Sequence, residues 1–465
     1  MDLIVLGICG LVVAELLMRL PLVASVRTIT ATAGKAVQTV SCKSISDHWK
    51  ERVLPIYALR MGLTSIKAFA WLLLAFSPFL LLDLVWPGEA ENGMMARLLD
   101  WRVMLGLTVL CGGYASLRAR ASRYSDAAAG VNSDYSALDR FLHKMVLGVP
   151  FVSEMVHDIE RGAFLKSAPD ISGQPHVFIA GLARAGTTVL LRDLHLTGQF
   201  GTLTYSDMPF VLAPNLWSRL RGQSDPGALR ERAHGDGIQV NAESPEAFDE
   251  VYWRVQDGEA YIRPDRLLLH TPSSDVVSGF TDYMALILKR RGKTRYLSKN
   301  NNNILRLETL TLAYPAAHFL VPIRDPLQHA NSLLRQHRRF ADCDAFTADY
   351  MDWLGHHEFG RTHRPFVFDT PPDGDPNTMD YWLQVWIDAY RHISRISAEN
   401  LTVVEIEKLA TDPSVQRKLA KKLDLPMLDM TEMRPIPRKE VEPVDQDLVA
   451  EAMRIFNALR SVDGF

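Results

Sequence analysis

The sequence has few cysteines and little net charge. Its 465 residues include four cysteines that lie far apart, Cys9, Cys42, Cys111 and Cys343. Such spacing gives neither a disulfide framework nor the Cys-x-x-Cys pairs of a zinc site. The formal net charge is −3, so the chain lacks the broad basic field of a nucleic-acid-binding protein. We expect no nucleic-acid partner, and any anionic ligand must be bound by local groups.

Internal repeats and low-complexity tracts are also absent, and long apolar runs occur only near the beginning of the sequence, at 3–23, 68–86 and 103–117. Residues 68–82 carry no charge, and the run approaches the roughly 20 residues that cross a bilayer core, so we predict a transmembrane helix there. The first run contains Glu15 and Arg19, four residues apart, which can pair on one helical face. This run either spans the membrane or lies at its interface. The third run is short for spanning and is expected to pack against the second.

The charges around these runs predict an orientation. No small-residue cleavage site precedes a polar start, which favours an anchor over a signal peptide. Basic residues outnumber acidic ones between the first two runs and follow the third run, while the segment between the second and third is mildly acidic. By the positive-inside rule, everything after residue 117 faces the cytoplasm. We predict membrane-anchoring helices at 1–123, a helical connector at 124–174 and a large domain at 175–465.

Short β-rich runs alternate with helical periodicity in that domain. The predicted strands are 176–180, 295–299, 318–323 and 401–405, and the predicted helices are 187–196, 304–312, 327–337 and 413–423. The segment 369–376, rich in Pro, Gly and Asp, is predicted to be a surface loop. This alternation predicts an α/β fold, a doubly wound parallel sheet of the P-loop nucleotide-binding type. Ligands of such sheets bind beyond the carboxyl ends of the strands.

The first predicted strand leads directly into a glycine-containing loop and then a helix. The sequence is Gly181-Leu182-Ala183-Arg184-Ala185-Gly186-Thr187-Thr188. Backbone N–H groups at the helix start can hold a phosphate, and the threonine hydroxyls add donors. The loop lacks the lysine of GxxxxGK[ST], which makes a metal-dependent ATPase or kinase less favoured. Alternatively, it is an uninvolved turn with the threonines as helix caps.

A second phosphate-binding pattern follows the strand 318–323. Arg324 stands at the carboxyl end of that strand, before Asp325-Pro326, and Ser332 lies about two helical turns further on. A planar guanidinium offers a two-pronged contact to phosphate, and the serine hydroxyl can donate to the same group. The pattern is specific only in combination with the preceding loop.

Together these residues resemble the sulfotransferases that use 3′-phosphoadenosine 5′-phosphosulfate (PAPS). The stretch 178–188 is similar to the family's loop for the 5′-phosphosulfate, and Arg324 with Ser332 resembles its 3′-phosphate signature. Lys299 stands after a strand, as does the family's lysine that contacts the transferring group, and 403–413 resembles a late family segment. The likeness covers about 175–425. Ala185 departs from the usual serine and removes one donor.

The resemblance implies a mechanism without metal. Arg184 and Lys299 are assigned to the bridging and sulfuryl oxygens, and Ala183, Ala185, Gly186, Thr187 and Thr188 to the phosphate loop. Asp207 is the first candidate for the general base, although an Asp-x-Pro sequence is equally typical of a helix start. The other candidates for this role share polar segments and are Glu243, Glu246 and His337.

The expected partners are the PAPS donor, a hydroxyl or amine acceptor and the membrane. The predicted anchor favours an acceptor near the inner leaflet, such as a lipid or lipid-linked glycan. Two other functions stay open. One is a P-loop phosphotransferase that uses ATP or GTP with Mg²⁺. The other is a non-catalytic membrane scaffold that retains the fold.

Overall fold

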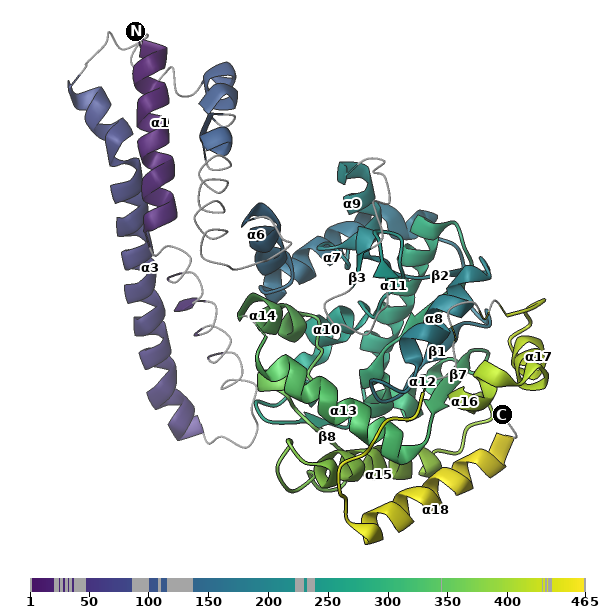
Figure 1. Ribbon diagram of the computed structural model, residues 1–465. Coiled ribbons are helices and arrows are strands. Elements are labelled where there is room, and N and C mark those ends of the chain that lie inside the picture. Colours follow the sequence, from purple (N-terminus) through teal and green to yellow (C-terminus); the bar gives the residue numbers. More distant parts are fainter. Residues whose placement is uncertain are drawn as a thin grey trace. The chain divides into compact units, whose positions relative to one another are not determined.

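In a computed structural model the chain divides into two units, Met1–Arg140 and Phe141–Phe465 (Figure 1). The residues that the structure describes are 2–20, 25, 28–29, 32, 36, 47–85, 100–107, 110–114, 137–221, 230–231, 239–343, 345–428, 430, 433 and 437–463. Much of the predicted basic connector, the acidic segment between the second and third runs and most of the connector after 123 lie outside these residues. Each unit is described by itself.

The first unit is built from two long helices, α1 (Asp2–Arg19) and α3 (Asp47–Val85). One stretch within the described residues, Pro55–Phe79 of α3, is long and apolar enough to cross a membrane. It starts earlier than the predicted span 68–86, because α3 continues through the basic residues that precede that run. Large apolar side chains stand exposed on it, with Ile66 66% and Phe69 61% accessible. This is the pattern of a helix that meets lipid or another protein rather than its own core.

The sequence predicts that the third apolar run packs against the second, and the contacts that the structure describes for it join it to the first. The Cys111 thiol donates to the Gly10 carbonyl over 3.4 Å, and a Cβ placed at Gly10 would lie 2.9 Å from Leu107. The Tyr114 hydroxyl donates to Glu15 over 2.8 Å. The predicted partner of Glu15, Arg19, lies outside the described side chains.

A five-stranded parallel sheet organises the second unit, and this confirms the predicted fold class. Its order is β2-β6-β1-β7-β9. The strands are β1 (Val177–Ile179), β2 (Phe200–Gly201), β6 (Arg295–Lys299), β7 (His318–Ile323) and β9 (Leu401–Glu405). The chain starts at the central strand β1, builds one side through β2 and β6, and then crosses to β7 and β9. The strand order therefore reverses beside β1, which is where ligands of such sheets bind.

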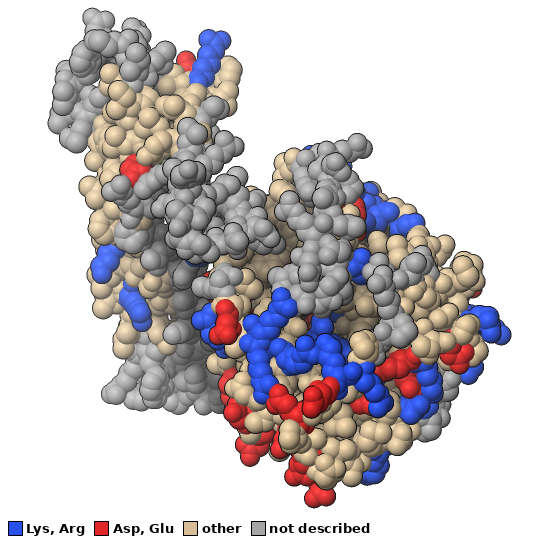
Figure 2. Space-filling view, in the orientation of Figure 1, with Lys and Arg blue, Asp and Glu red and all other residues tan. Residues whose placement is uncertain are grey.

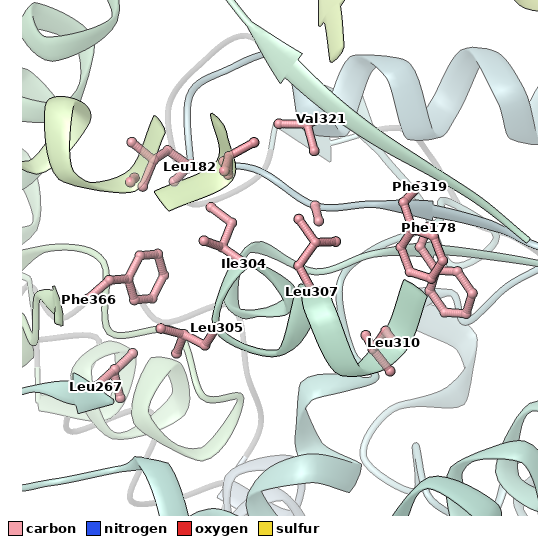
Figure 3. Packing of buried hydrophobic residues seen from close by; sticks show 14 of the residues in the cluster. Phe178, Leu182, Leu267, Ile304, Leu305, Leu307, Leu310, Phe319, Val321 and Phe366 are labelled. Carbon is pink, nitrogen blue, oxygen red and sulfur yellow. The ribbon is translucent and has the colours of Figure 1, made fainter. Parts of the chain in front are cut away.

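Alternate residues of each strand serve two apolar layers, one on each face of the sheet. Phe178, Phe319 and Val321 face the larger layer, where the rings of Phe178 and Phe319 stack with centroids 4.9 Å apart (Figure 3). Val177 and Leu320 face the smaller layer, which is completed by α8, α16 and α17. Helices on both faces make the sheet doubly wound, and both layers hold its strand ends in place.

The helices of the sheet layers differ in length and in where they start. Those on or near the site are α8 (Thr187–Leu196), η2 (Tyr205–Asp207), α10 (Glu250–Tyr261), α11 (Ser274–Arg291), η3 (Asn301–Arg306), α12 (Leu307–Ala313), α13 (Pro326–Ala341), α16 (Ile406–Thr411) and α17 (Pro413–Lys422). Predicted boundaries differ most at 304–312, because a 3-10 turn over the four asparagines precedes α12, and at α13, which extends to Ala341.

The remaining elements lie around this framework. They are α6 (Ala137–Val146), α7 (Pro150–Phe164), η1 (Leu165–Ser167), α9 (Pro214–Arg221), β3 (Arg230–Glu231), β4 (Gln239–Val240), β5 (Leu267–Leu268), α14 (Ala345–Trp353), η4 (Gly360–Thr362), β8 (Phe366–Val367), α15 (Met379–Arg395) and α18 (Gln446–Asp463). The predicted loop 369–376 is indeed without regular structure and mostly exposed.

Candidate active site

Three adjacent strands bring the predicted site residues to one edge of the sheet. The loop 180–186 follows β1, Lys299 ends β6, and Arg324 follows β7. Ile179 of β1 is in register with Lys299 on one side and with Leu320 on the other. The carboxyl ends of the three strands are therefore neighbours, as the parallel arrangement requires.

The loop after β1 is shaped for an anion. Gly186 has φ 95° and precedes α8, and a Cβ there would lie 3.1 Å from Ile406, so the position favours glycine. Arg184 also has a positive φ, 68°. His329 of α13 donates from Nε2 to the Ala183 carbonyl over 2.8 Å and fixes the loop from the other side. The N–H groups that open α8 have no acceptor within the helix and are available to a phosphate.

The two predicted phosphate-binding patterns meet in the structure. Arg184 Nε lies 3.4 Å from the Ser332 hydroxyl, and Arg324 Nη1 donates to the Arg184 carbonyl over 3.2 Å. The Arg324 side chain is buried, and its Nε has no hydrogen-bond partner among the described residues; Glu407 stands 3.6 Å away. Burial lowers the pKa of Arg324, Glu407 opposes this and Arg184 adds to it. An anion between the two arginines would satisfy these groups.

The positive charge on the surface of the larger unit is local. On the face shown in Figure 2, basic side chains gather near the middle of the larger unit and acidic side chains border them. The net charge of −3 agrees with this mixture. Affinity for an anion thus depends on the few arginines of the site rather than on a general field.

Lys299 is paired with a carboxylate. Its Nζ lies 3.5 Å from Glu246 Oε1, and the two side chains are only 7% and 8% exposed. The Tyr205 hydroxyl donates to Glu246 Oε2 over 3.4 Å, and the Ala247 N–H donates to Oε1 over 3.0 Å. Glu246 was a second choice from the sequence, and it is the carboxylate that the structure places next to Lys299.

Asp207, the first choice, has other partners. It ends the short helix η2, where it accepts from the Thr204 N–H over 2.8 Å as part of a capping box. It also forms a buried ion pair with Arg291. Burial raises the pKa of Asp207, and Arg291 opposes this shift. These contacts are those of a capping residue that holds η2 against α11.

The other two candidates lie in different surroundings. Glu243 is half exposed and stands 3.5 Å from Arg291 Nη1. His337 accepts from the Gly360 N–H over 3.3 Å and packs against the rings of Trp382 and His363. Burial lowers the pKa of His337. Neither is joined to Lys299 by a contact that the structure describes.

Two features of the site were missed from the sequence. The segment Gly355-His356-His357-Glu358 lies against the asparagines that follow Lys299, with Asn301 Nδ2 donating to Glu358 over 2.7 Å. Beneath it, Glu250 and Arg306 form a fully buried ion pair. The adjacent histidines followed by a glutamate were a visible signal of the first feature. The second had none, because the two residues are 56 positions apart.

Among the described residues, no group of three His, Cys, Asp or Glu side chains is arranged to hold a metal ion. The cysteines that the structure describes, Cys9, Cys111 and Cys343, are free thiols.

Comparison with known proteins shows the family of the chain. The profile of the sulfotransferase family matches residues 175–429, more than half of the chain. Among solved structures, sulfotransferase STF1 from Mycobacterium tuberculosis H37Rv is 16% identical (TM-score 0.41, covering 70% of this chain and 86% of that chain). Sulfotransferase STF9 from Mycobacterium avium is 15% identical (TM-score 0.42, 71% and 87%), and a sulfotransferase domain from the curacin biosynthetic pathway is 13% identical (TM-score 0.28, 61% and 97%). No curated protein matches. The chain belongs to the sulfotransferase family.

Proposed function

We propose that the protein transfers a sulfuryl group from PAPS to a hydroxyl or amine of its acceptor. The observation that carries the proposal is the convergence of Arg184, Arg324 and Ser332 at the ends of strands beside Lys299 and Glu246. A nucleotide with phosphates at both ends of its ribose needs two separate anion sites, and the loop at 181–188 and the pair Arg324–Ser332 supply them.

The groups fit the donor. The buried Arg324, whose Nε is ion-paired with Glu407 but makes no hydrogen bond to a described residue, suits the 3′-phosphate, and the loop Ala183–Gly186 with Thr187 and Thr188 suits the 5′-phosphate. Because the Arg184 side chain stands beside Ser332, we propose the 3′-phosphate as its ligand, in addition to the bridging oxygen to which the resemblance assigns it. Ala185 is fully buried, and its N–H donates to the Leu182 carbonyl over 3.3 Å, so the remaining donors for the 5′-phosphate are the N–H groups that open α8 and the threonine hydroxyls.

In the mechanism, PAPS supplies an activated sulfuryl group on a phosphate leaving group. Lys299 stabilises the negative charge that develops on the leaving oxygen as its bond to sulfur breaks. Glu246 accepts the proton of the acceptor hydroxyl or amine as the new bond to sulfur forms, and it stands 3.5 Å from Lys299. The products are the sulfated acceptor and 3′-phosphoadenosine 5′-phosphate (PAP). This chemistry requires alignment and charge, and no step in it assigns a role to a metal.

Calorimetric titration of the detergent-solubilised protein with PAP, ADP and GDP tests the donor. PAP should bind about 10-fold to 100-fold more tightly than ADP, because loss of a charge-assisted phosphate contact costs roughly 1.5–3 kcal/mol. The affinity should be the same in EDTA and in Mg²⁺. Equal affinity for ADP and PAP, or a requirement for Mg²⁺, would favour the P-loop phosphotransferase instead.

The base is tested by two carboxamide variants. Glu246→Gln should lower turnover about 100-fold or more, the typical contribution of a general base, with little effect on PAP affinity. Asp207→Asn should lower the thermal midpoint through the ion pair with Arg291 while it keeps most of the turnover. The opposite pattern would return the role to Asp207.

We place the enzyme at the membrane with its larger unit in the cytoplasm. Support comes from the exposed apolar side chains of Pro55–Phe79 and from the basic excess around the apolar runs. An acceptor at the inner leaflet, a lipid or a lipid-linked glycan, follows from that position. A membrane-impermeant maleimide applied to intact cells should label Gly93→Cys and leave Asp373→Cys unlabelled, with the native cysteines replaced in both. Labelling of the second variant alone would overturn the orientation.

A further inference from the structure

The segment Gly355–Glu358 is fastened to the residues directly after Lys299. Asn301 Nδ2 donates to Glu358 Oε1 over 2.7 Å, and Asn302 Nδ2 donates to the Gly355 carbonyl over 2.9 Å. Gly355 has φ 75°, and a Cβ there would lie 2.6 Å from Cγ of Glu250. The backbone can approach this closely only because position 355 is glycine.

His356 extends this contact to the segment that carries Glu246. Its Nε2 donates to the Ala247 carbonyl over 3.2 Å, and its Nδ1 lies 3.8 Å from Glu358 Oε2. The His356 and Glu358 side chains are 14% and 10% exposed, so both are largely screened from water. Both ring nitrogens are thereby directed at oxygen atoms, which suits the doubly protonated imidazolium.

These contacts close a ring. Asn301, two residues after Lys299, is hydrogen-bonded to Glu358, and Glu358 faces His356. His356 donates a hydrogen bond to the Ala247 carbonyl. Ala247 follows Glu246, whose carboxylate lies 3.5 Å from Lys299 and completes the ring. Lys299 and Glu246 therefore contact each other directly, and they are also connected indirectly through His356 and Glu358.

We infer that His356, oriented by Glu358, is a positioning residue that holds the Glu246 carboxylate opposite Lys299 for proton transfer. This inference rests on the proposed function. His356 does not itself contact the reacting atoms; it acts through the backbone of Ala247. Rate effects of about 100-fold follow from displacements near 1 Å in such a site, so loss of the ring should slow transfer substantially.

The charge on His356 makes the arrangement sensitive to pH. The titratable groups that face it are Glu358, Lys299, Glu246 and the neighbouring His357. Burial works to lower the pKa of His356, but Glu358 outweighs this, and the pKa lies above its usual value. Proton loss as the pH rises through that pKa removes the attraction to Glu358 and loosens the ring. Glu358 stays ionised throughout, since its own pKa is held well below the usual range despite burial.

The test uses the full-length protein in detergent, with PAPS as donor and water as acceptor, so that no natural acceptor is needed. His356→Ala should lower the rate of PAPS desulfation about 10-fold to 100-fold and leave PAP affinity within two-fold. His356→Gln, whose amide can still donate to the Ala247 carbonyl, should recover part of the rate. The wild-type rate should fall as the pH rises through the pKa of His356, and this fall should be missing in His356→Gln. His357→Gln is the matched control, because His357 pairs with Asp352 and Arg364 instead.

The outcomes separate the inference from the proposed function. Normal desulfation and an unchanged pH profile in His356→Gln would overturn the positioning role and leave the function intact. Slow desulfation by His356→Gln with the fall in rate at high pH retained would show that His356 has only a general structural role. An equal loss of rate in His357→Gln would show the same, and either result would overturn the positioning role. A wild-type protein that neither binds PAP nor desulfates PAPS would overturn the proposed function, and the inference with it. Should His356→Ala fail to fold, His356→Gln carries the test alone.

Discussion

Two buried ion pairs join the same two segments of the molecule and differ in the length and number of their contacts. Glu250 and Arg306 are fully buried, with two contacts of 2.7 and 3.0 Å, and the guanidinium lies over the rings of Trp253 and Tyr261 at 4.8 and 5.0 Å. Glu246 and Lys299, four and seven residues earlier in the chain, make one contact of 3.5 Å. The first pair is joined by two short contacts, while the second is joined by one longer contact.

The difference between the pairs separates side chains that stabilise the fold from side chains that we assign to catalysis. Glu250 also accepts from Tyr261 and from Asn300, the residue that follows Lys299. Burial works to raise the pKa of Glu250, but Arg306 outweighs it and holds the pKa below its usual range. Removal of one partner of such a buried pair lowers the free energy of unfolding strongly, so we assign the pair to the stability of the fold and not to ligand binding. The Glu246–Lys299 pair is longer, and contacts between catalytic groups are often long in the free enzyme and shorten in the complex.

Breaking the buried pair should give the largest effect. Glu250→Ala leaves the Arg306 guanidinium without its carboxylate, and removal of one partner of a buried pair costs about 3–5 kcal/mol of the free energy of unfolding. Chemical denaturation of the wild type, Glu250→Ala and Glu246→Ala measures this. The last variant is the control and should lose much less. Equal losses in both variants would remove the distinction between the pairs.

Removal of the cation of the loose pair should affect turnover instead. Lys299→Ala should lower turnover about 100-fold to 1000-fold, the range for loss of one group that stabilises developing charge. Affinity for PAP should change little, because that charge appears mainly in the transition state. Steady-state rates and calorimetry on one preparation provide both numbers. A fall in PAP affinity as large as the fall in turnover would contradict this role.

The matching variant at the nucleotide site should show the reverse. Arg324→Ala should weaken PAP binding about 10-fold to 100-fold, corresponding to roughly 1.5–3 kcal/mol, with ADP affinity nearly unchanged. At saturating PAPS, turnover should stay close to that of the wild type. Discrimination between PAP and ADP that survives in Arg324→Ala would show that the 3′-phosphate is bound elsewhere.

The sequence predicts the sheet and the strand ends better than it predicts the contacts between them. The strand 318–323 was found from its apolar residues, and Arg324 follows from where that strand ends, since parallel strands meet at one edge. Lys299 also stands at the end of a predicted strand, but it was identified from the resemblance to the family. The choice between Asp207 and Glu246 was not possible, because it depends on Arg291, 84 residues from Asp207, and on Lys299, 53 residues from Glu246. His356 was missed although the adjacent histidines and the glutamate are visible in the sequence, because its contact with Ala247 joins residues 109 positions apart.

The smallest expected effect concerns two buried histidines, His329 and His356, whose pKa values are shifted in opposite directions. Burial lowers the pKa of His329 to about 3, and that side chain is fully buried against the phosphate loop. An unfolded histidine takes up a proton near pH 6.5, so the stability that neutral His329 contributes is present above that value and is lost as the pH falls. For His356, whose pKa is raised, the contribution is present below pH 6.5 and is lost as the pH rises through the folded pKa.

Between pH 6.5 and 5.5 the stability lost through His329 should be about 1 kcal/mol. Denaturation of the wild type and His329→Gln at both values isolates it, because carboxylates that titrate in the same range affect both proteins alike. The difference between the two proteins should shrink by that amount at the lower pH, and a constant difference would show that His329 takes up its proton without unfolding, in a site less sealed than its burial implies.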